Sequence, residues 1–528
     1  MVAFAFALSA FVVPNDPCWP SPSTFSTLNT TLSGHLIQTQ PPASVCYPTQ
    51  PNYDPTLCTS ILRSWFQSNF HASDPASIGW LWWAHNPCPP IYPNGTSVTG
   101  NPDAGSKGCS VGAYPAYAVN ATEVGHVVAA VGWARETGVR LVVKSTGHSF
   151  QRRSTGLGAN VCRIWTHNMR GIEYHEHFQH YGCPSREKQM AFTVAAGERV
   201  RHVYTAANER NLVVVAGSSQ DVGIVGWFSG GGHGPLSSTY GFGVDNVLQI
   251  TIVTPDGTLR TASPCLNPDL FWALRGGGGG TFGVITSVTM KAYPSPQVAR
   301  HTFSMALTDR KTSPDGLDVG VGTIEALFAP IAQKLDPENG TTIVYNSHVE
   351  HYPSFFATWN ATVRFEPVAS VGAALGSRLL PSESLTANTT QLARVLQDIT
   401  TPAEEHTIPP MLQAFPVANN NAAMTEETSI TPAWRDAVLH FIVIDYFPDS
   451  DTYAEAKPAL DRMTYERIAA LKALAPDTGA YLNEADPFDP DWQQIKATYD
   501  LESLLWCISC VGSENWAEDS SGRLCKVS

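Results

Sequence analysis

The sequence has few charged residues, and they form no basic run. Lys, Arg, Asp and Glu make up 15% of the 528 residues, against about 25% in an average soluble domain. The net charge is -14, from 32 Lys and Arg against 46 Asp and Glu. A nucleic-acid-binding surface needs clustered positive charge, so this composition disfavours a nucleic-acid partner.

Several familiar catalytic signatures are also absent. The chain contains no P-loop sequence, so no P-loop site is predicted. His175-Glu176 begins like a zinc-protease motif, but Gln179 stands where the second histidine is needed. Cys507 and Cys510 form one CxxC pair without a second pair, which favours disulfide partners over metal ligands. No metal site is therefore predicted.

The sequence offers no apolar run of the roughly 20 residues that a membrane-spanning helix needs. The apolar run at residues 2–13 is typical of a signal-peptide core, although no Lys or Arg precedes it, and residues 1–15 are predicted to be a signal peptide. Asn-X-Ser/Thr acceptors also favour the secretory pathway. They are Asn29, Asn94, Asn120, Asn339, Asn360 and Asn388. We therefore expect a secreted, extracellular protein without a stable membrane span.

Five of the cysteines crowd a Pro-rich N-terminal region, at Cys18, Cys46, Cys58, Cys88 and Cys109. Disulfides would stabilise a region with so little periodic structure. The sequence does not fix the pairing, and the odd total of 11 leaves at least one thiol without an intramolecular partner. Residues 16–112 are predicted to be an extension that covers the protein rather than a core.

The length predicts more than one domain, because single hydrophobic cores stop growing near ~250–300 residues. Residues 113–295 are rich in glycine and mix helical and strand patterns. Residues 296–476 have fewer glycines and predict a second α+β domain, which leaves 477–528 as a C-terminal segment. In that second domain we expect helices over 322–335, 391–399 and 454–473, and strands over 342–345, 358–365 and 438–446.

Clear element signals open the glycine-rich domain. Val124, Val127, Val128 and Val131 follow helical spacing, and Gly138 ends the predicted helix. The β-branched run 140–144 predicts a buried strand. Further on, strands are expected over 192–195 and 212–215 with a helix over 199–210 between them. Residues 247–254 and 259–261 flank a Pro-Asp-Gly turn and predict a hairpin.

Three glycine-rich segments, at 145–149, 217–234 and 276–283, allow close approach of the backbone to a ligand. Small residues at 145–149 can turn several N–H groups toward one anion, such as a pyrophosphate. His148 stands at the tip of this turn, where an ordinary turn histidine is the alternative. Three such segments suit a long ligand held by main-chain N–H groups. The residues alone thus predict a dinucleotide-like cofactor in an α+β domain.

A Rossmann site is the competing interpretation of these glycines. Gly230, Gly232 and Gly234 resemble part of its fingerprint, and Asp256 lies roughly 20 residues further on. Asp256, however, belongs to the Pro-Asp-Gly turn, and no amphipathic helix follows Pro235. We therefore predict that the glycines serve a different nucleotide-binding fold.

The order of the motifs resembles the FAD-linked oxidases of the vanillyl-alcohol oxidase/p-cresol methylhydroxylase (PCMH) superfamily, and within it the berberine-bridge-enzyme-like secreted fungal members. The motifs are Lys-Ser-Thr-Gly-His-Ser-Phe, Gly-Ser-Ser-Gln-Asp-Val-Gly, Ser-Gly-Gly-Gly-His-Gly-Pro-Leu, Asp-Leu-Phe-Trp-Ala-Leu-Arg-Gly-Gly-Gly and Tyr-Leu-Asn-Glu-Ala-Asp. The resemblance implies an α+β fold, with a two-subdomain FAD-binding domain of the PCMH type at 113–295. A substrate domain with an antiparallel sheet would follow at 296–476, and 477–528 would pack back on the FAD domain.

The resemblance also implies FAD bound covalently through His148 to the flavin 8α carbon, which raises the cofactor's potential. Ser219 aligns with a cysteine that makes a second flavin bond in some relatives, so a single covalent link is expected. The predicted cofactor-binding residues are Ser145, Thr146, Gly147, His148, Ser149, Phe150, Gly217, Ser218, Ser219, Val222, Gly223, Gly226, Gly232, Gly234 and Ile285.

For catalysis, the resemblance implies an oxidase that passes hydride from a small-molecule alcohol, carbohydrate or secondary metabolite to the flavin, with O2 as acceptor and H2O2 as product. Relatives carry a basic tyrosine after the Asn of a Tyr-X-Asn-Tyr motif. This chain has Tyr481, Asn483 and Glu484 there, so Glu484 is the candidate base. A solvated or salt-bridged loop carboxylate is the alternative for Glu484.

Three departures from the family pattern leave other functions open. Arg152 replaces a glycine beside the histidine turn, and cysteines usual before Cys18 are missing, so Cys18 is a candidate free thiol. After Gln494 about three turns of helix are absent. There are therefore two alternatives to an oxidase. One is a flavin-binding protein without turnover, and the other is a dehydrogenase or oxidative cyclase that uses oxygen poorly.

Overall fold

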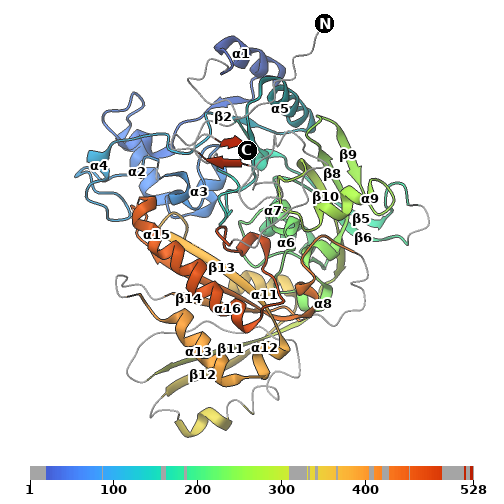
Figure 1. Cartoon of the computed structure of the whole chain (residues 1–528). Helices are drawn as coiled ribbons and strands as arrows, with labels where there is room; N and C mark the ends of the chain where they lie inside the picture. The colour runs from blue at the N-terminus through green and yellow to red at the C-terminus, as the bar shows by residue number, and fades with distance from the viewer. Residues whose placement is uncertain are drawn as a thin grey trace.

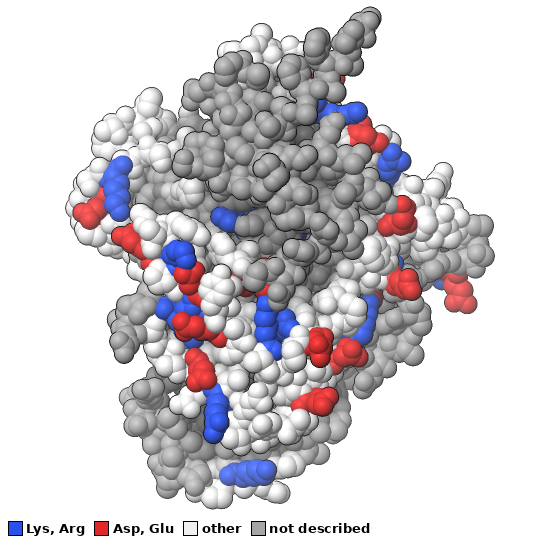
Figure 2. Space-filling model, in the orientation of Figure 1, with Lys and Arg blue, Asp and Glu red and all other residues white. Residues whose placement is uncertain are grey.

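The computed structural model describes residues 19–85, 87–155, 162–183, 187–307, 330, 333–338, 343–363, 367–403, 410–418, 427–450, 452–489, 516–518 and 524–526. The predicted signal peptide, Cys18, most of the expected helix at 322–335, the Cys507–Cys510 pair and the segment after Gln494 lie outside these ranges. Among the described residues, no helix is both long enough and apolar enough to cross a membrane. On the face shown in Figure 2, positive and negative side chains are interspersed.

The N-terminal extension is a folded part of the core, so the prediction of a mere cover was wrong. Its elements are α1 (Pro22–Thr31), β1 (Leu36–Gln38), the 3-10 helix Pro42–Cys46, α2 (Pro55–Ser64), α3 (Ser68–Ser73), the 3-10 helix Leu81–Ala84 and α4 (Ala104–Lys107). Asp54 caps α2, with its side chain accepting from the N–H groups of Thr56 and Leu57. Disulfides Cys46–Cys58 and Cys88–Cys109 cross-link it.

Tryptophans explain why the extension is buried. Trp65 is 1% exposed, and Trp82 and Trp83 belong to the same buried cluster as Val443 and Phe447 of the second domain. Sequence periodicity did not reveal this cluster because the apolar residues come from short helices and loops rather than from one long amphipathic stripe. The extension therefore shares a core with the second domain, and in Figure 1 its helices α2, α3 and α4 lie on the left, above that domain.

The first half of the glycine-rich domain is a four-stranded sheet in the order β1-β2-β4-β3. Its elements are β2 (Tyr117–Asn120), α5 (Val124–Thr137), β3 (Leu141–Lys144) and β4 (Cys162–Trp165). Strands β2, β4 and β3 pair in parallel. The predicted helix and strand are confirmed, and Gly138 ends α5 with φ 71°. Cys162 is a buried free thiol within this sheet.

The second half is an antiparallel sheet in the order β5-β6-β10-β8-β9, with β7 paired to β10. It contains β5 (Ile172–Phe178), β6 (Gln189–Ala195), α6 (Val200–Asn208), β7 (Leu212–Val214), α7 (Ile224–Ser229), α8 (Ser237–Tyr240), β8 (Val247–Val253), β9 (Leu259–Ala262), α9 (Pro268–Leu274) and β10 (Val284–Pro294). The predicted hairpin is β8–β9. Asp256 bonds Thr254, Thr258 and Arg260 within its turn. That carboxylate therefore has a local structural role, as the argument against a Rossmann site required.

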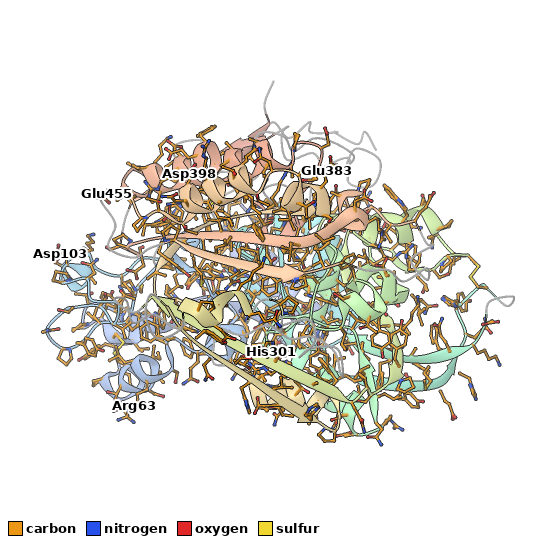
Figure 3. The ribbon with its side chains drawn as sticks, turned by 90° about the horizontal axis from the view of Figure 1, so that it is seen from below. Arg63, Asp103, His301, Glu383, Asp398 and Glu455 are labelled. Carbon is orange, nitrogen blue, oxygen red and sulfur yellow. A yellow bond between two sulfur atoms is a disulfide. The ribbon has the colours of Figure 1, made fainter. Side chains whose placement is uncertain are left out.

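The second domain contains two further antiparallel arrangements, β11–β12 and β13-β15-β14. Its strands are β11 (Val298–Leu307), β12 (Ile343–Tyr352), β13 (Gly372–Pro381), β14 (Met411–Pro416) and β15 (Ala437–Phe447). Its helices are α11 (Phe355–Thr362), α12 (Ser382–Thr386), α13 (Thr389–Thr400), α14 (Ala433–Asp436), α15 (Tyr453–Arg462), the π-helix Met463–Arg467 and α16 (Ile468–Leu474). Exposed Glu383, Asp398 and Glu455 mark the outer side of this helical layer (Figure 3).

One expected strand in this domain is a helix. Residues 358–365 were predicted as a strand, but Phe355–Thr362 form α11. The Ser354 side chain accepts from the N–H of Ala357 and caps the helix. Phe355 and Trp359, one helical turn apart, both contact the ring of Tyr204 on α6 at 5.1 Å between centroids. The cap and the aromatic pair outweigh the strand propensity of this short run.

Candidate active site

The histidine turn begins where β3 ends and rests on the N-terminal extension. Gly147 has φ 86°, and its carbonyl accepts from the N–H of Gly79 at 3.0 Å. A Cβ at Gly147 would lie 3.2 Å from the Cα of Ile78, so a side chain there would push the two segments apart. The sequence predicted a close approach of this turn to a ligand. In the structure, the turn also lies close to the Ile78–Gly79 segment of the N-terminal extension.

The buried side chain of Lys144 also links the histidine turn to the N-terminal extension. It is 1% exposed, and its ammonium donates to the backbone carbonyls of His71 at 2.8 Å and Asp74 at 2.5 Å. Burial lowers the pKa of Lys144 well below its usual value. The strand that leads into the histidine turn is therefore tied to α3, a support that the sequence did not reveal.

The carbonyl of His71 accepts from Lys144, and the buried side chain of His71 should make the stability of the protein sensitive to acid. Its ring nitrogens bond Ser77 at 2.6 Å and the Trp65 carbonyl at 2.5 Å, and burial lowers its pKa to about 3. Because the unfolded state takes up the proton near pH 6.5, its contribution to stability is complete above that pH and falls as pH drops toward 3. Between pH 6.5 and 4.5 we expect a loss of about 2–3 kcal/mol from this group. The free energy of unfolding should be measured across this pH range for two variants. Its fall should be smaller in His71→Gln than in wild type, and unchanged in His177→Gln, because His177 is exposed.

His148 is held neutral in a dry position. Within the described part of the chain, its Nε2 is shielded from solvent and has no hydrogen-bond partner. Burial lowers the pKa of His148 to about 4, with Asp221 opposing and Arg199 and Lys144 adding to the effect. A neutral imidazole nitrogen with an available lone pair is the form that can act as a nucleophile.

The three glycine segments converge. A Cβ at Gly223 would lie 3.0 Å from the Ser145 hydroxyl, which joins the second segment to the histidine turn. The N–H of Gly278 donates to the carbonyl of Ser229 at 2.9 Å, which joins the third segment to the second. These residues lie far apart in sequence, and the structure brings them to one place, as a single extended ligand would require.

Gly234 offers a direct test of this packing. A Cβ at Gly234 would stand 2.0 Å from the carbonyl oxygen of Ala216 and 3.2 Å from the Cα of Gly217. Gly234→Ala should therefore separate the two chain segments and cost about 1–3 kcal/mol of stability. The free energy of unfolding, measured by chemical denaturation, and the flavin absorbance per protein should both fall. Gly132→Ala within α5 is the matched control, because no atom lies within 4 Å of the position that its Cβ would take.

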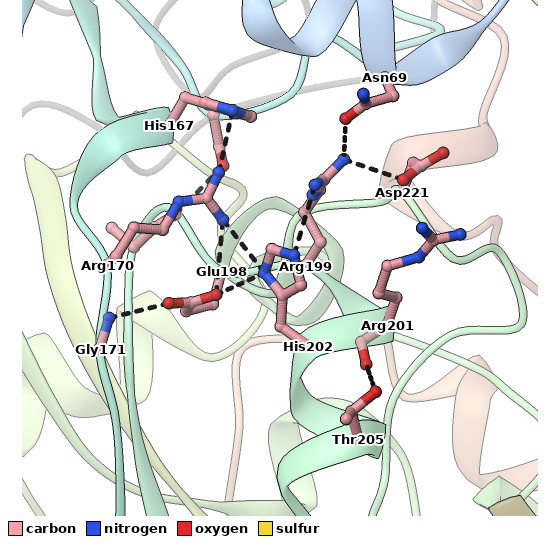
Figure 4. A network of polar contacts seen from close by, with 12 residues as sticks. Asn69, His167, Arg170, Gly171, Glu198, Arg199, Arg201, His202, Thr205 and Asp221 are labelled. Atoms are coloured by element: carbon pink, nitrogen blue, oxygen red, sulfur yellow. Dashed lines mark hydrogen bonds and ion pairs between the residues drawn. The ribbon is translucent and has the colours of Figure 1, made fainter.

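A polar network stands beside the second segment (Figure 4). Arg199 donates to the carboxylate of Asp221 at 2.9 Å and to Asn69 at 2.6 Å, and Ser68 donates to the other Asp221 oxygen at 2.6 Å. Glu198 in turn accepts from His202 at 2.5 Å. The network ties α3 and the start of α6 to the loop that carries Asp221, the residue whose charge acts on His148.

The C-terminal loop closes over α7. Asn483 donates to the carbonyl of Gly226 at 2.8 Å, and the Tyr481 hydroxyl donates to the carbonyl of Trp227 at 2.8 Å. Asn483 also donates to the Tyr481 hydroxyl at 2.7 Å, and Gln151 donates to the carbonyl of Ala485 at 2.9 Å. Tyr481 and Asn483 thus hold the loop, and Gln151 joins it to the histidine turn.

Glu484 lies at the centre of a polar cluster. Its Oε2 is 3.0 Å from Nε2 of His233 and 2.7 Å from Nε2 of His440. The Glu484 side chain is 17% exposed, so it is not solvated, whereas its contacts with His233 and His440 fit the salt-bridged carboxylate of the alternative. Burial raises the pKa of Glu484, but the charge and N–H groups of His233 and His440 outweigh it and hold that pKa at about 2. We call these three residues the His-Glu-His cluster.

The remaining predicted residues occupy varied positions. Phe150 packs on Trp80 with centroids 5.0 Å apart, and Ser149 accepts from the backbone N–H of Arg153 at 3.0 Å. Ser218 accepts at its carbonyl from the indole of Trp359 at 2.9 Å. Of the others, three are buried and two are half-buried: Thr146, Gly232 and Ile285, and Ser219 and Val222.

Arg152 does not occupy the turn as a free charge. Its φ is 49°, in the left-handed region that favours glycine. Its guanidinium stacks 5.0 Å from the ring of Trp83 and 5.6 Å from that of Phe488. The charge is thus directed toward two neighbouring aromatic rings, one from the N-terminal extension and one from the C-terminal loop.

Comparison with known proteins now gives the family. A family model described as an FAD binding domain matches residues 115–263. The FAD-linked oxidoreductase patO of Aspergillus clavatus is 32% identical over 567 aligned positions, covering 98% of this chain and 94% of that protein. The chain belongs to the VAO-type FAD-linked oxidoreductases. The predicted superfamily, enzyme class and α+β fold are thereby confirmed.

Other VAO-type proteins are similar over the same extent. The VAO-type flavoprotein oxidase VAO615 of Thermothelomyces thermophilus is 31% identical over 575 positions, covering 98% of this chain and 96% of that one. The crystal structure of MtVAO713 from Myceliophthora thermophila C1 superposes with a TM-score of 0.88 at 26% identity, covering 98% and 100% of the two chains. A carbohydrate oxidase from Microdochium nivale shares the fold, with a TM-score of 0.59 at 19% identity.

Two residues of the candidate site were not predicted from the sequence. His233 stands in a motif that drew attention only through its glycines, and His440 lies inside the apolar strand β15. A buried histidine in an apolar run is a weak signal, since most such residues have a structural role. Only the fold brings both rings to Glu484, so spacing along the chain could not have found them.

Proposed function

We propose that this protein is a secreted FAD-dependent oxidase that converts an alcohol or carbohydrate to the carbonyl compound, with O2 as acceptor and H2O2 as product. The observation that supports this most is the convergence of the three glycine segments, which include the turn that carries His148 and the segment that ends beside His233. When bound, FAD supplies the hydride acceptor and the route of electrons to O2.

The residues present fit FAD. Close-packed glycines leave main-chain N–H groups without side chains above them, which suits a pyrophosphate. His148, with a shielded and unbonded Nε2, fits the role of the covalent attachment point. Ser219 offers a hydroxyl where a thioether would need a thiol, so one covalent bond is proposed.

Proton removal from the substrate is assigned to the His-Glu-His cluster. Loss of hydride from an alcohol carbon leaves positive charge unless the hydroxyl proton departs. Glu484 and its two imidazoles are the titratable groups beside Tyr481 and Asn483, which hold the C-terminal loop on α7. The cluster can therefore accept a proton close to the glycine segments.

Three disulfides among the described residues, including Cys183–Cys265, agree with an oxidising compartment. The test of the function is a screen of alcohols, sugars and phenolic metabolites with purified yellow protein, read by peroxide release. Peroxide with at least one substrate class is the expected result. Flavin reduced by substrate but reoxidised slowly in air would identify a dehydrogenase, and no reduction by any substrate would contradict the proposal.

A further inference from the structure

The His-Glu-His cluster assembles from three distant segments. His233 follows the glycines after α7, His440 lies on β15 and Glu484 on the C-terminal loop. The backbone carbonyl of His233 accepts from the Trp227 indole at 2.8 Å, which fixes the position of the histidine. The rings of His233 and His440 lie 5.0 Å apart at an interplanar angle of 63°. Each imidazole can therefore reach the same carboxylate oxygen.

The hydrogen bonds set the tautomers of the two imidazoles. An ionised carboxylate only accepts, so Nε2 of His233 and Nε2 of His440 must both carry protons. In neutral imidazoles the proton acceptor is then Nδ1. Nδ1 of His440 is buried, has no partner among the described residues, and belongs to a side chain that is 0% exposed. A substrate cannot reach it there.

His233 differs from His440 in access. Its side chain keeps 11% of its surface exposed, and in the described part of the chain Nδ1 makes no hydrogen bond. The groups that face His233 are Glu484 and His440, and the rings of Tyr481 and Phe415 lie 5.3 Å and 5.0 Å away. Nδ1 of His233 is thus the accessible basic nitrogen of the cluster.

Glu484 is poorly suited to take the proton itself. Its carboxylate already accepts two N–H groups, and its pKa of about 2 makes it a weak base near neutral pH. A carboxylate bonded to the far nitrogen of an imidazole instead orients the ring and stabilises the imidazolium that forms. The arrangement of His233 and Glu484 has this geometry.

We propose that Nδ1 of His233 is the atom that accepts the hydroxyl proton of the substrate, and that Glu484 and His440 are positioning residues. This inference rests on the proposed oxidase function. The substrate O–H bond breaks and its proton forms the N–H bond on His233, while the O–H electron pair becomes the second C–O bond. FAD, when bound, would take the C–H electron pair as hydride and would supply O2 with the two electrons that, with two protons, give H2O2.

The kinetic test uses flavin-loaded protein and a substrate from the peroxide screen. His233→Ala should lower kcat/KM by about 10²–10⁴-fold, with acid-stable flavin colour and melting temperature retained. Added imidazole should restore part of the lost rate, because it supplies the missing base in the vacated space. Adding Glu484→Gln to His233→Ala should lower the rate little further, because the two residues act as a unit. The exposed His177→Ala should behave as wild type.

The wild-type pH profile separates an imidazole from a carboxylate acceptor. An acid limb of kcat/KM near pH 6–7 is expected for an imidazole, whereas a carboxylate would place it below about pH 4.5. A limb below about pH 4.5 would overturn the inference. So would His233→Ala with activity within about threefold of wild type, or a complete failure of imidazole to restore the rate, since about 10²-fold effects are required of a general base.

A second readout does not depend on turnover. Diethylpyrocarbonate labelling of the substrate-free protein, mapped by peptide mass spectrometry, should modify His233 and spare His440; a protected His233 contradicts the inference. Metal analysis gives another decisive result, since the ligand atoms of the three residues all lie within 4.8 Å of one another. Stoichiometric zinc held by them would overturn the role of the imidazole as base. If wild-type protein oxidises nothing, the proposed function itself fails, while the labelling still decides whether Nδ1 is accessible.

Discussion

Replacing His148 with alanine should release the flavin from the protein on acid precipitation. Wild-type protein is expected to give a yellow pellet, because the single covalent bond through His148 survives denaturation. In His148→Ala the colour should move to the supernatant, and the flavin fluorescence of the denatured protein band should vanish. Both are all-or-none results that need no substrate.

The same variant should also oxidise substrate more slowly. Removing the covalent bond lowers the flavin potential, and for a two-electron couple every ~30 mV corresponds to about 1.4 kcal/mol of driving force. A dye-equilibration titration would measure the shift in non-covalently loaded protein. His177→Ala on β5 is the matched control, since this histidine is exposed. Acid-stable colour in His148→Ala would assign the bond to another residue.

Glu484→Gln should lower kcat by about 10²–10⁴-fold, or roughly 3–5 kcal/mol in activation free energy. The amide oxygen can still accept from His233 and His440, so the shape of the cluster is kept. What is lost is the negative charge that stabilises a protonated imidazole. Steady-state peroxide release at saturating substrate measures the effect.

The control for Glu484→Gln is Glu383→Gln, an exposed carboxylate on α12. It removes one negative charge from the surface and should leave kcat unchanged. Glu484→Gln with normal kcat, normal flavin content and normal melting temperature would show that the cluster has no part in proton transfer. A fall in flavin content alone would indicate a structural role.

The sequence predicted much of the glycine-rich domain because its signals are local. Gly138, the Pro255-Asp256-Gly257 turn and the β-branched strand at 141–144 each determine their own backbone geometry. The contacts between segments were out of reach, since nothing near Lys144 in the sequence indicates that its ammonium binds the carbonyls of His71 and Asp74. The same limit applies to the His-Glu-His cluster.

The error at 358–365 shows how context decides a short apolar run. Thr358, Trp359 and Val363 are β-branched or aromatic residues, which favour a strand, yet Ser354 supplies a helix cap four residues before Thr358. Burial of Trp359 against α6 then favours the helix. A cap just before an ambiguous run was the signal that could have corrected the prediction.

The support that the N-terminal extension gives to the histidine turn has a consequence for biosynthesis. Gly79 and the carbonyls of His71 and Asp74 hold the turn from below, and they are translated before it. The support for His148 is therefore translated before the turn, but the tryptophans of the extension share a core with Val443 and Phe447, which are translated much later. A chain shortened to start at the FAD-binding domain would lack these contacts beneath the histidine turn.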